Sequence, residues 1–251
     1  MRKIIDLSVS LTPNDKSVRP PKIEYVSHEK SAERSAMAYG IKAEDFRERK
    51  YAAIEHINLT THDTTHLDSP YHYYPTSEGE KAKTIDEIPL EWCFCDGVVL
   101  DFHHKDKGEK ITAEEVKQAL SEIGYELKSL DIVLIRTDSY KFHGKAGFEN
   151  MHPGMSKEAT LWLIEHGVKI MGIDAWGWDR ALDVMIEDLK AGDKDQFWES
   201  HYLGKEREYC HLERLANLDK IPIPYGFKVS VFPIKIEAAS AGWVRAVAII
   251  E

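Results

Sequence analysis

Residues 62–72 read His-Asp-Thr-Thr-His-Leu-Asp-Ser-Pro-Tyr-His, so eleven residues hold three histidines and two aspartates. Zinc, manganese and iron are bound by neutral imidazole and by carboxylate, and this stretch supplies both kinds of ligand at high density. A single histidine is usually a surface or core residue, but this cluster indicates a metal site. We expect His62, His66 and Asp68 to converge on one cation, with His72 just beyond it.

The backbone around this stretch is predicted to be a strand that runs into an irregular loop. On a helix, the first two histidines of the stretch would share one face, as in zinc metalloproteases. However, threonines at positions 60, 61, 64 and 65 lose rotamer freedom in a helix, and Ser69-Pro70 would end one. The preceding residues, 52–61, alternate between apolar and polar side chains like a strand.

Further along the chain, short apolar runs predict buried strands that alternate with helices. The runs are residues 97–102, 131–138 and 168–174. Thr112 and Glu115 form a capping-box pattern ahead of a helix, and Ser156 can cap a second one. This order predicts an α/β fold, a mixed sheet with packed helices, to which the N-terminal and C-terminal parts add strands. With no convincing linker, residues 1–251 are expected to form a single domain.

Composition excludes several classes of partner and compartment. The 251 residues carry 33 Lys+Arg and 43 Asp+Glu, a formal net charge of −10. This balance argues against nucleic acid or an anionic membrane as the main partner. No apolar run approaches the ~20 residues of a membrane span, and the N-terminus turns polar too early for a secretory signal. Three cysteines do not suggest a disulfide framework, so a cytoplasmic protein is expected.

The stretch 62–72 resembles the fingerprint His-X-Gly-Thr-His-X-Asp-X-Pro-X-His of the cyclase family of metal-dependent hydrolases, which includes kynurenine formamidase (arylformamidase) and isatin hydrolase. Thr64 replaces the glycine of that pattern, which is awkward if the position requires a positive φ. Similarity also appears at the Ile-Asp-Leu-Ser opening and at the C-terminal residues 232–250. The resemblance implies the swivelling β/β/α architecture and a homodimer.

A second ligand group is implied by the same resemblance. In the kynurenine formamidase branch, a histidine and a glutamate twelve residues later complete a binuclear site, and His201 and Glu213 keep that spacing. Asp68 would then bridge the ions. His211 is a rival for His201, but it lies only two residues from Glu213 and has no counterpart in the pattern. The expected cofactor is therefore Zn²⁺ or Mn²⁺, as one or two ions.

The expected chemistry is hydrolysis of an amide, formamide or cyclic amide or lactone. A divalent ion would lower the pKa of a bound water, and His72 would transfer the proton to the leaving group. Two alternatives remain open: a non-haem Fe(II) oxygenase that uses two histidines and one carboxylate, and a non-catalytic, metal-stabilised binding protein.

The substrate is predicted to be a small molecule, possibly with an aromatic ring. Tyr73, Trp176 and Trp178 are the candidate substrate-binding residues, because their rings can stack on a flat ligand or can simply close the core. Residues 16–52 show no clear pattern. They are predicted to form either a lid or oligomer arm, or a solvated loop with a short helix.

Overall fold

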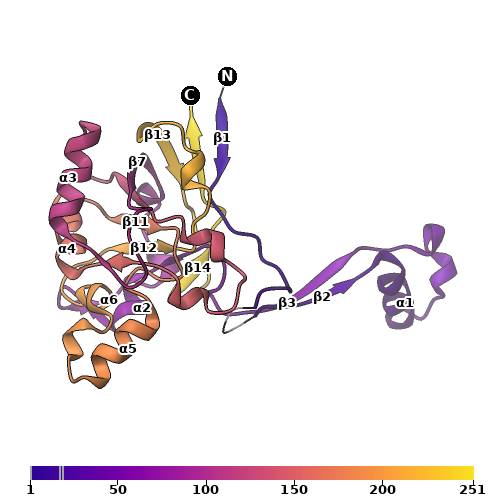
Figure 1. The fold of residues 1–251 in the computed structure, drawn as a ribbon. Coiled ribbons are helices and arrows are strands. Elements are labelled where there is room, and N and C mark those ends of the chain that lie inside the picture. The colour runs from indigo at the N-terminus through magenta and orange to yellow at the C-terminus, as the bar shows by residue number, and fades with distance from the viewer. Residues whose placement is uncertain (1, 17, 19) are drawn as a thin grey trace.

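The computed structural model describes residues 2–16, 18 and 20–251. Within them, nine strands form one mixed sheet that runs through the body of the molecule (Figure 1). In spatial order these strands are β1 (Lys3–Asp6), β15 (Val247–Ile250), β13 (Tyr225–Ser230), β7 (Phe94–Asp101), β9 (Ile132–Arg136), β11 (Ile170–Ile173), β12 (Cys210–Glu213), β4 (His66–Asp68) and β14 (Ala241–Trp243). The central strands β7, β9, β11 and β12 are parallel to one another, and the outer pairs are antiparallel.

The predicted α/β class with a mixed sheet is confirmed. The three apolar runs become β7, β9 and β11, which lie side by side at the centre of the sheet. Strands buried on both faces read as continuous apolar runs, which is why the sequence revealed them. The predicted helices are α3 (Ala113–Ile123) and α4 (Lys157–Glu165). The Thr112 hydroxyl accepts from the Glu115 amide at 3.3 Å, and the Glu115 carboxylate accepts from the Thr112 amide at 2.8 Å.

Apolar side chains pack on both faces of the sheet. On one face, α3, α4 and the short α6 (Glu199–Leu203) cover alternate residues of the central strands, such as Val98 and Val133. On the other face, Val99 and Leu134 pack against 3₁₀ turns and loops from both ends of the chain. The termini meet because β1 pairs with β15 (Figure 1).

The other elements of the body, apart from the arm formed by residues 20–58, are small. They are α2 (Pro70–Tyr73), α5 (Leu182–Lys190), β5 (Thr76–Ser77), β6 (Glu80–Lys81), β8 (Lys110–Ile111), β10 (Gly154–Met155), and the 3₁₀ turns η3 (Ile85–Glu87), η4 (Leu90–Cys93), η5 (Ser139–Phe142), η6 (Phe148–Asn150), η7 (Lys194–Gln196) and η8 (Leu218–Lys220).

Across the described residues, no helix combines the length and the apolar composition that a membrane span needs.

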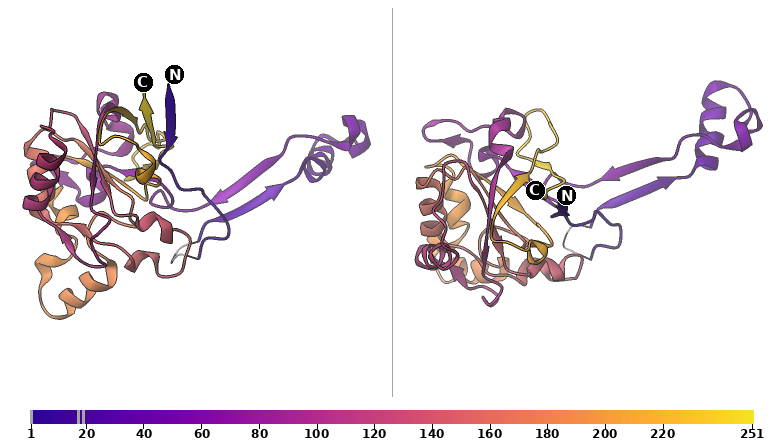
Figure 2. Two further views of the ribbon diagram at one scale, coloured as in Figure 1. Left: turned by 45° about the horizontal axis from the view of Figure 1, so that its top comes forward. Right: turned by 90° about the horizontal axis from the view of Figure 1, so that it is seen from above.

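Residues 20–58 form an arm that projects from the body (Figures 1 and 2). Its shaft is an antiparallel ribbon of β2 (Lys22–Val26) and β3 (Ile54–Asn58). At its tip lie α1 (His28–Tyr39) and the turns η1 (Ala43–Asp45) and η2 (Arg47–Arg49). For residues 16–52 the sequence left two alternatives open, a lid or oligomer arm, and a solvated loop with a short helix. The structure shows a folded hairpin that extends from the body as an arm.

Candidate metal centre

The stretch 62–72 forms a tight turn, a short strand and a single helical turn. The Asp63 carboxylate closes the turn by accepting from the backbone amide of Thr60 at 2.8 Å and from its hydroxyl at 3.1 Å. β4 then lies between β12 and β14, and Pro70 begins α2 at a position where its missing N–H leaves no bond unmade. The predicted strand-and-loop backbone is thus confirmed over the helical alternative, although the strand that follows the turn was not foreseen.

Thr64 occupies the left-handed region of backbone space, with φ = 57°. This conformation suits glycine and is unfavourable for a β-branched residue. It points the Thr64 carbonyl at His66 Nδ1, 2.9 Å away, which fixes the orientation of that imidazole ring. The Thr64 hydroxyl donates to the Val9 carbonyl at 3.3 Å. The turn therefore keeps the shape a glycine would favour while carrying a threonine.

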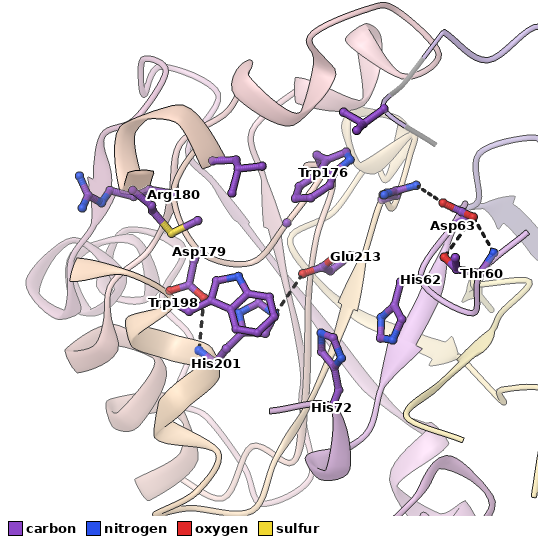
Figure 3. A pocket seen from close by; sticks show the side chains of 15 residues that line it. Thr60, His62, Asp63, His72, Trp176, Asp179, Arg180, Trp198, His201 and Glu213 are labelled. Carbon is purple, nitrogen blue, oxygen red and sulfur yellow. Dashed lines mark hydrogen bonds and ion pairs between the residues drawn. The ribbon is translucent and has the colours of Figure 1, made fainter. Parts of the chain in front are cut away.

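One group of ligand atoms combines His62, Asp68 and His72. His62 Nδ1 lies 2.8 Å from Asp68 Oδ1, and His72 Nε2 lies 3.8 Å from Asp68 Oδ2. The two imidazole rings are neighbours, with their centroids 4.0 Å apart. Both are partly exposed, so this group faces the pocket described below (Figure 3).

A second group combines Asp68, His201, His211 and Glu213, and its ligand atoms all lie within 4.8 Å of one another. His211 Nε2 lies 3.1 Å from Asp68 Oδ2 and 3.3 Å from Glu213 Oε1. His201 Nε2 is 3.7 Å from the same glutamate oxygen. All four residues are buried, and Asp68 belongs to both groups, as a bridging carboxylate would.

His66 completes the cluster from the strand β4. Its Nε2 lies 3.3 Å from Asp68 Oδ1 and 3.6 Å from Glu213 Oε2. All six residues predicted at the centre, the five ligands and His72, are thus brought together around Asp68. Whether each of them ligates an ion remains a prediction.

Buried polar atoms without hydrogen-bond partners indicate that a cation belongs here. Among the described residues, these atoms include both carboxylate oxygens of Asp68 and the Nε2 atoms of His66 and His211. Buried polar groups in proteins are almost always paired. Imidazole nitrogens and carboxylate oxygens that converge in this way suit Zn²⁺ or Mn²⁺, so the donor set fits the predicted ion.

The cluster holds several side chains in forms that bind a cation. Burial raises the pKa of a carboxyl group, but the imidazoles of His72, His62 and His66 hold the pKa of Asp68 well below its usual range. For Glu213, burial is likewise outweighed, chiefly by the contact with His211, and its pKa falls to about 2. Burial lowers the pKa of His72 to about 3, which leaves its imidazole neutral.

His211 differs because its proton competes with an ion. Burial acts to lower its pKa, yet its contacts with the carboxylates of Asp68 and Glu213 raise the pKa to about 9. In the ion-free protein it therefore carries a proton between two carboxylates. Binding of a divalent cation would release that proton, a common coupling in metal sites.

Residues around the cluster orient its imidazoles. Asp179 contacts His201 Nδ1 through a short hydrogen bond, which leaves the other ring nitrogen aimed at Glu213. The Tyr73 hydroxyl lies 3.1 Å from His211 Nδ1. Such partners fix the tautomer and ring orientation of metal-bound histidines.

Two of the predicted substrate-binding residues, Tyr73 and Trp178, do not line the pocket described below. Trp178 is completely buried: its ring stacks on His211 with centroids 5.5 Å apart, and its indole N–H donates to the Thr160 hydroxyl at 3.0 Å. Tyr73 is 3% exposed and lies against the same histidine. Both rings pack behind the cluster, since their polar groups are already used there.

A pocket of about 250 Å³ opens onto the cluster (Figure 3). Trp176 lines it as predicted, beside the guanidinium of Arg214, which lies 5.3 Å from the Trp176 ring centroid. Trp198 lines another part and stacks on His201, with centroids 4.5 Å apart. The other lining residues are Val18, Thr60, His62, Asp63, His72, Gly177, Asp179, Arg180, Leu182, Met185, His201 and Glu213.

Sequence reasoning missed His211 as a partner of the site and Trp198 as a pocket residue. The signal for His211 was present, because its separation of two residues from Glu213 puts both side chains on one face of a strand. That face is the one directed at Asp68, since β12 pairs with β4. Trp198 had no such signal, because it precedes α6 with φ = 54°, a conformation that no pattern predicts.

Comparisons with known proteins agree with this geometry. Residues 5–180 match the Cyclase family model ("Putative cyclase"). An isatin hydrolase bound to the product analogue thioisatinate superposes with a TM-score of 0.78 at 23% identity, covering 99% of this chain and 92% of that one. Isatin hydrolase A from Ralstonia solanacearum gives a TM-score of 0.79 at 23% identity, with 100% and 92% coverage.

A third solved structure is described as a potential metal-dependent hydrolase with cyclase activity. It gives a TM-score of 0.65 at 17% identity and covers 100% of this chain and 99% of that one. No curated protein sequence matches. The likeness to these structures confirms the predicted cyclase-like fold, and the family match covers well over half of the sequence. The chain belongs to the Cyclase family.

Proposed function

We propose that the protein is a metal-dependent hydrolase that opens an amide, formamide or cyclic amide bond of a small aromatic substrate. The observation that carries this proposal is the position of the His and carboxylate cluster at the floor of an aromatic-lined pocket. The likeness to isatin hydrolases supports it at the level of fold.

A divalent ion held by the cluster would polarise a substrate carbonyl and lower the pKa of a bound water. The protein's own residues supply the rest of the chemistry. Asp68 and Glu213 stay ionised in the buried cluster and keep it able to hold positive charge. Asp179 holds His201 in one tautomer.

His72 is the residue proposed to move the proton. It lines the pocket, and its Nε2 atom is 3.8 Å from the Asp68 carboxylate. A neutral imidazole accepts the proton of the attacking water, and the Asp68 carboxylate stabilises the imidazolium that results. The imidazolium then donates the proton to the leaving nitrogen, which closes the cycle.

The pocket walls suit a flat ring with a polar substituent. Trp176 and Trp198 offer aromatic surface, and Leu182 and Met185 extend the apolar lining. The Arg214 guanidinium, only 8% exposed, lies 3.6 Å from Asp63 and presents positive charge beside Trp176. This charge suits a second carbonyl on the substrate or the carboxylate of a ring-opened product.

The proposal is tested by removing metal with a chelator and reloading the protein separately with zinc and manganese. Ring opening of isatin and hydrolysis of N-formylkynurenine are then measured. We expect metal-dependent turnover of at least one of them. Absence of turnover of both, with metal bound, would overturn the proposal.

His72→Ala separates proton transfer from metal binding. General acid–base catalysis contributes about 10²–10⁴-fold, so turnover should fall by that factor while metal content stays unchanged. His104→Ala, which removes an exposed histidine, is the matched control and should retain full activity. A loss of bound metal in His72→Ala would instead make His72 a ligand.

Trp176→Leu tests the aromatic part of the proposal. Ring stacking contributes about 0.5–1.5 kcal/mol, so KM for the aryl substrate should rise roughly two- to twelvefold with little change in kcat. Equal KM values for variant and wild type would place the substrate ring elsewhere.

A further inference from the structure

Asp174 is a buried carboxylate that belongs to neither ligand group of the metal centre. It directly follows β11. Its Oδ1 atom accepts hydrogen bonds from the backbone amide and the hydroxyl of Thr137, each at 2.7 Å, and its Oδ2 atom accepts from the Asp138 amide at 2.9 Å. A buried charge costs free energy unless it is paired or hydrogen-bonded. These three donors therefore stabilise an ionised carboxyl group at this position.

The loop that receives this carboxylate has a fixed shape. It follows β9, which pairs in parallel with β11, so the carboxyl ends of the two strands lie at the same edge of the sheet. Asp138 takes φ = 62°, in the left-handed region, and its own side chain accepts from Arg136 Nε at 2.8 Å. Successive backbone N–H groups in such a turn form an anion-binding hollow, called a nest. The carboxylate of Asp174 occupies the nest formed by Thr137 and Asp138.

The loop directly after the nest carboxylate, residues 175–179, carries two contacts to the metal centre. The Trp178 amide donates to Glu213 Oε1 at 2.9 Å. Asp179 holds His201 through its short hydrogen bond. Supporting contacts of this kind orient the side chains that bind a metal. A displacement of the loop would therefore disturb a glutamate oxygen and an imidazole ring together.

The same loop forms part of the pocket wall. Trp176 and Gly177 both line the pocket. Gly177 lies close to the metal centre, because a Cβ atom at that position would be 3.8 Å from Glu213 Oε1. At the start of the loop, the Ala175 carbonyl accepts from the Arg214 amide at 2.9 Å. The position of this one loop thus affects both the substrate pocket and the metal centre.

We propose that Asp174 is a positioning residue for the hydrolysis: its carboxylate, bound in the nest, sets residues 175–179 against the metal centre and the pocket. This inference rests on the proposed function. Asp174 does not line the pocket, so it acts on the site only through the loop that follows it. Its two oxygens meet donors from Thr137 and Asp138, an arrangement that needs two acceptors on one side chain.

Asp174→Asn tests the proposal. Burial raises the pKa of Asp174 to about 7 against the effect of its hydrogen bonds, so the test is made at pH 8, where the wild-type carboxyl is ionised. The amide oxygen can replace Oδ1, but the NH₂ group then faces the Asp138 amide, where two donors meet. We expect the Trp178 N–H of the metal-free protein to exchange with deuterium roughly five- to 150-fold faster, the factor that one unpaired buried donor accounts for.

Zinc affinity is the second measurement, made by competition with a chromophoric chelator. It should fall about tenfold in Asp174→Asn, the lower end of the range for the loss of a supporting contact. Asp131→Asn is the matched control, because Asp131 is a buried aspartate at the opposite end of β9 that also accepts from a backbone amide, that of Lys128, at 2.8 Å. The control should keep the zinc affinity and the loop exchange of wild type.

Thr137 provides a milder pair of variants. Thr137→Val removes only the hydroxyl donor and should speed exchange of the Trp178 N–H by a smaller factor, while Thr137→Ser keeps the hydroxyl and should match wild type. If Asp174→Asn does not fold, this pair decides, and equal exchange in both variants would overturn the proposal.

A folded Asp174→Asn with a lower Tm but with unchanged exchange and zinc affinity would make Asp174 merely structural and would also overturn the proposal. So would equal changes in Asp131→Asn. Wild-type protein that binds no zinc would overturn the proposed function and this inference with it, whereas the other contrary outcomes overturn this inference alone.

Discussion

Asp179→Asn tests how the site holds one of its histidines. Asp179 is 3% exposed and uses both carboxylate oxygens. Oδ1 accepts from the Ser200 amide at 2.8 Å, while Oδ2 contacts the Nδ1 atom of His201. A carboxylate at Nδ1 keeps the proton on that nitrogen and leaves the Nε2 lone pair free for a cation.

Asparagine keeps the size of the side chain but not this preference. Its oxygen can still accept from Ser200, which turns the NH₂ group toward His201, where two donors would meet. The imidazole must then rotate away or move its proton to Nε2, the atom that faces Glu213. Loss of such a supporting contact typically lowers metal affinity 10–100-fold, which is about 1.4–2.8 kcal/mol.

Zinc affinity is measured by competition with a chromophoric chelator at neutral pH. Asp131→Asn is the matched control, because Asp131 is 2% exposed and accepts from the Tyr125 hydroxyl at 2.9 Å and the Lys128 amide at 2.8 Å, outside the cluster. The control should bind zinc as wild type does. Unchanged affinity in Asp179→Asn, or an equal loss in both variants, would refute this account of His201.

Three further predictions concern stability. Zinc at a thousandfold excess over its Kd should raise the free energy of unfolding by about 4 kcal/mol. For a chain of this size that corresponds to a rise in Tm of roughly 8–16 °C. A calorimetric scan that shows no such rise would argue against the site. Thr64→Gly should raise Tm by roughly 2 °C, because the relief of about 1–2 kcal/mol of left-handed strain exceeds the added freedom of the unfolded chain; a lower Tm would contradict it. The hydrogen bond from Arg136, with help from Lys141, lowers the pKa of Asp138 to about 2, so its stabilisation is present above the unfolded pKa near 4 and is lost as pH falls through 2. Asp138→Asn should accordingly lower Tm at pH 7 but not at pH 2, and an equal deficit at both values would disprove the link.

The central part of the fold was predictable from local sequence. The runs that became β7, β9 and β11 are buried on both faces, and the capping residues of α3 and α4 act within four positions of themselves. The outer strands were harder to predict. β4 has only three residues, and its pairing with β12 and β14 joins segments more than 140 positions apart, which no local pattern records.

The site, like the fold, divides into residues that local sequence predicts and residues that it does not. The density of histidine and aspartate in residues 62–72 predicts four members of the site, His62, His66, Asp68 and His72. His201 and Glu213 are predicted only by the family resemblance. The sequence pattern favours His201 over His211, because His211 lies only two residues from Glu213 and has no counterpart in the family motif. The β12 backbone makes that nearness an advantage, because residues two apart in a strand share a face. The sequence also predicts a substrate-binding role for Tyr73 and Trp178, because an aromatic residue looks the same in sequence whether it lines a pocket or packs against a histidine of the cluster.

The place of β4 in the sheet has a consequence for how the protein is made. Asp68 is paired on one side with His211 and on the other with Ala241, so its strand is fixed only when both later segments have arrived. During synthesis the first ligands leave the ribosome long before their partners. The strand that carries His66 and Asp68 therefore gains its second paired edge only after residues 241–243 have been synthesised.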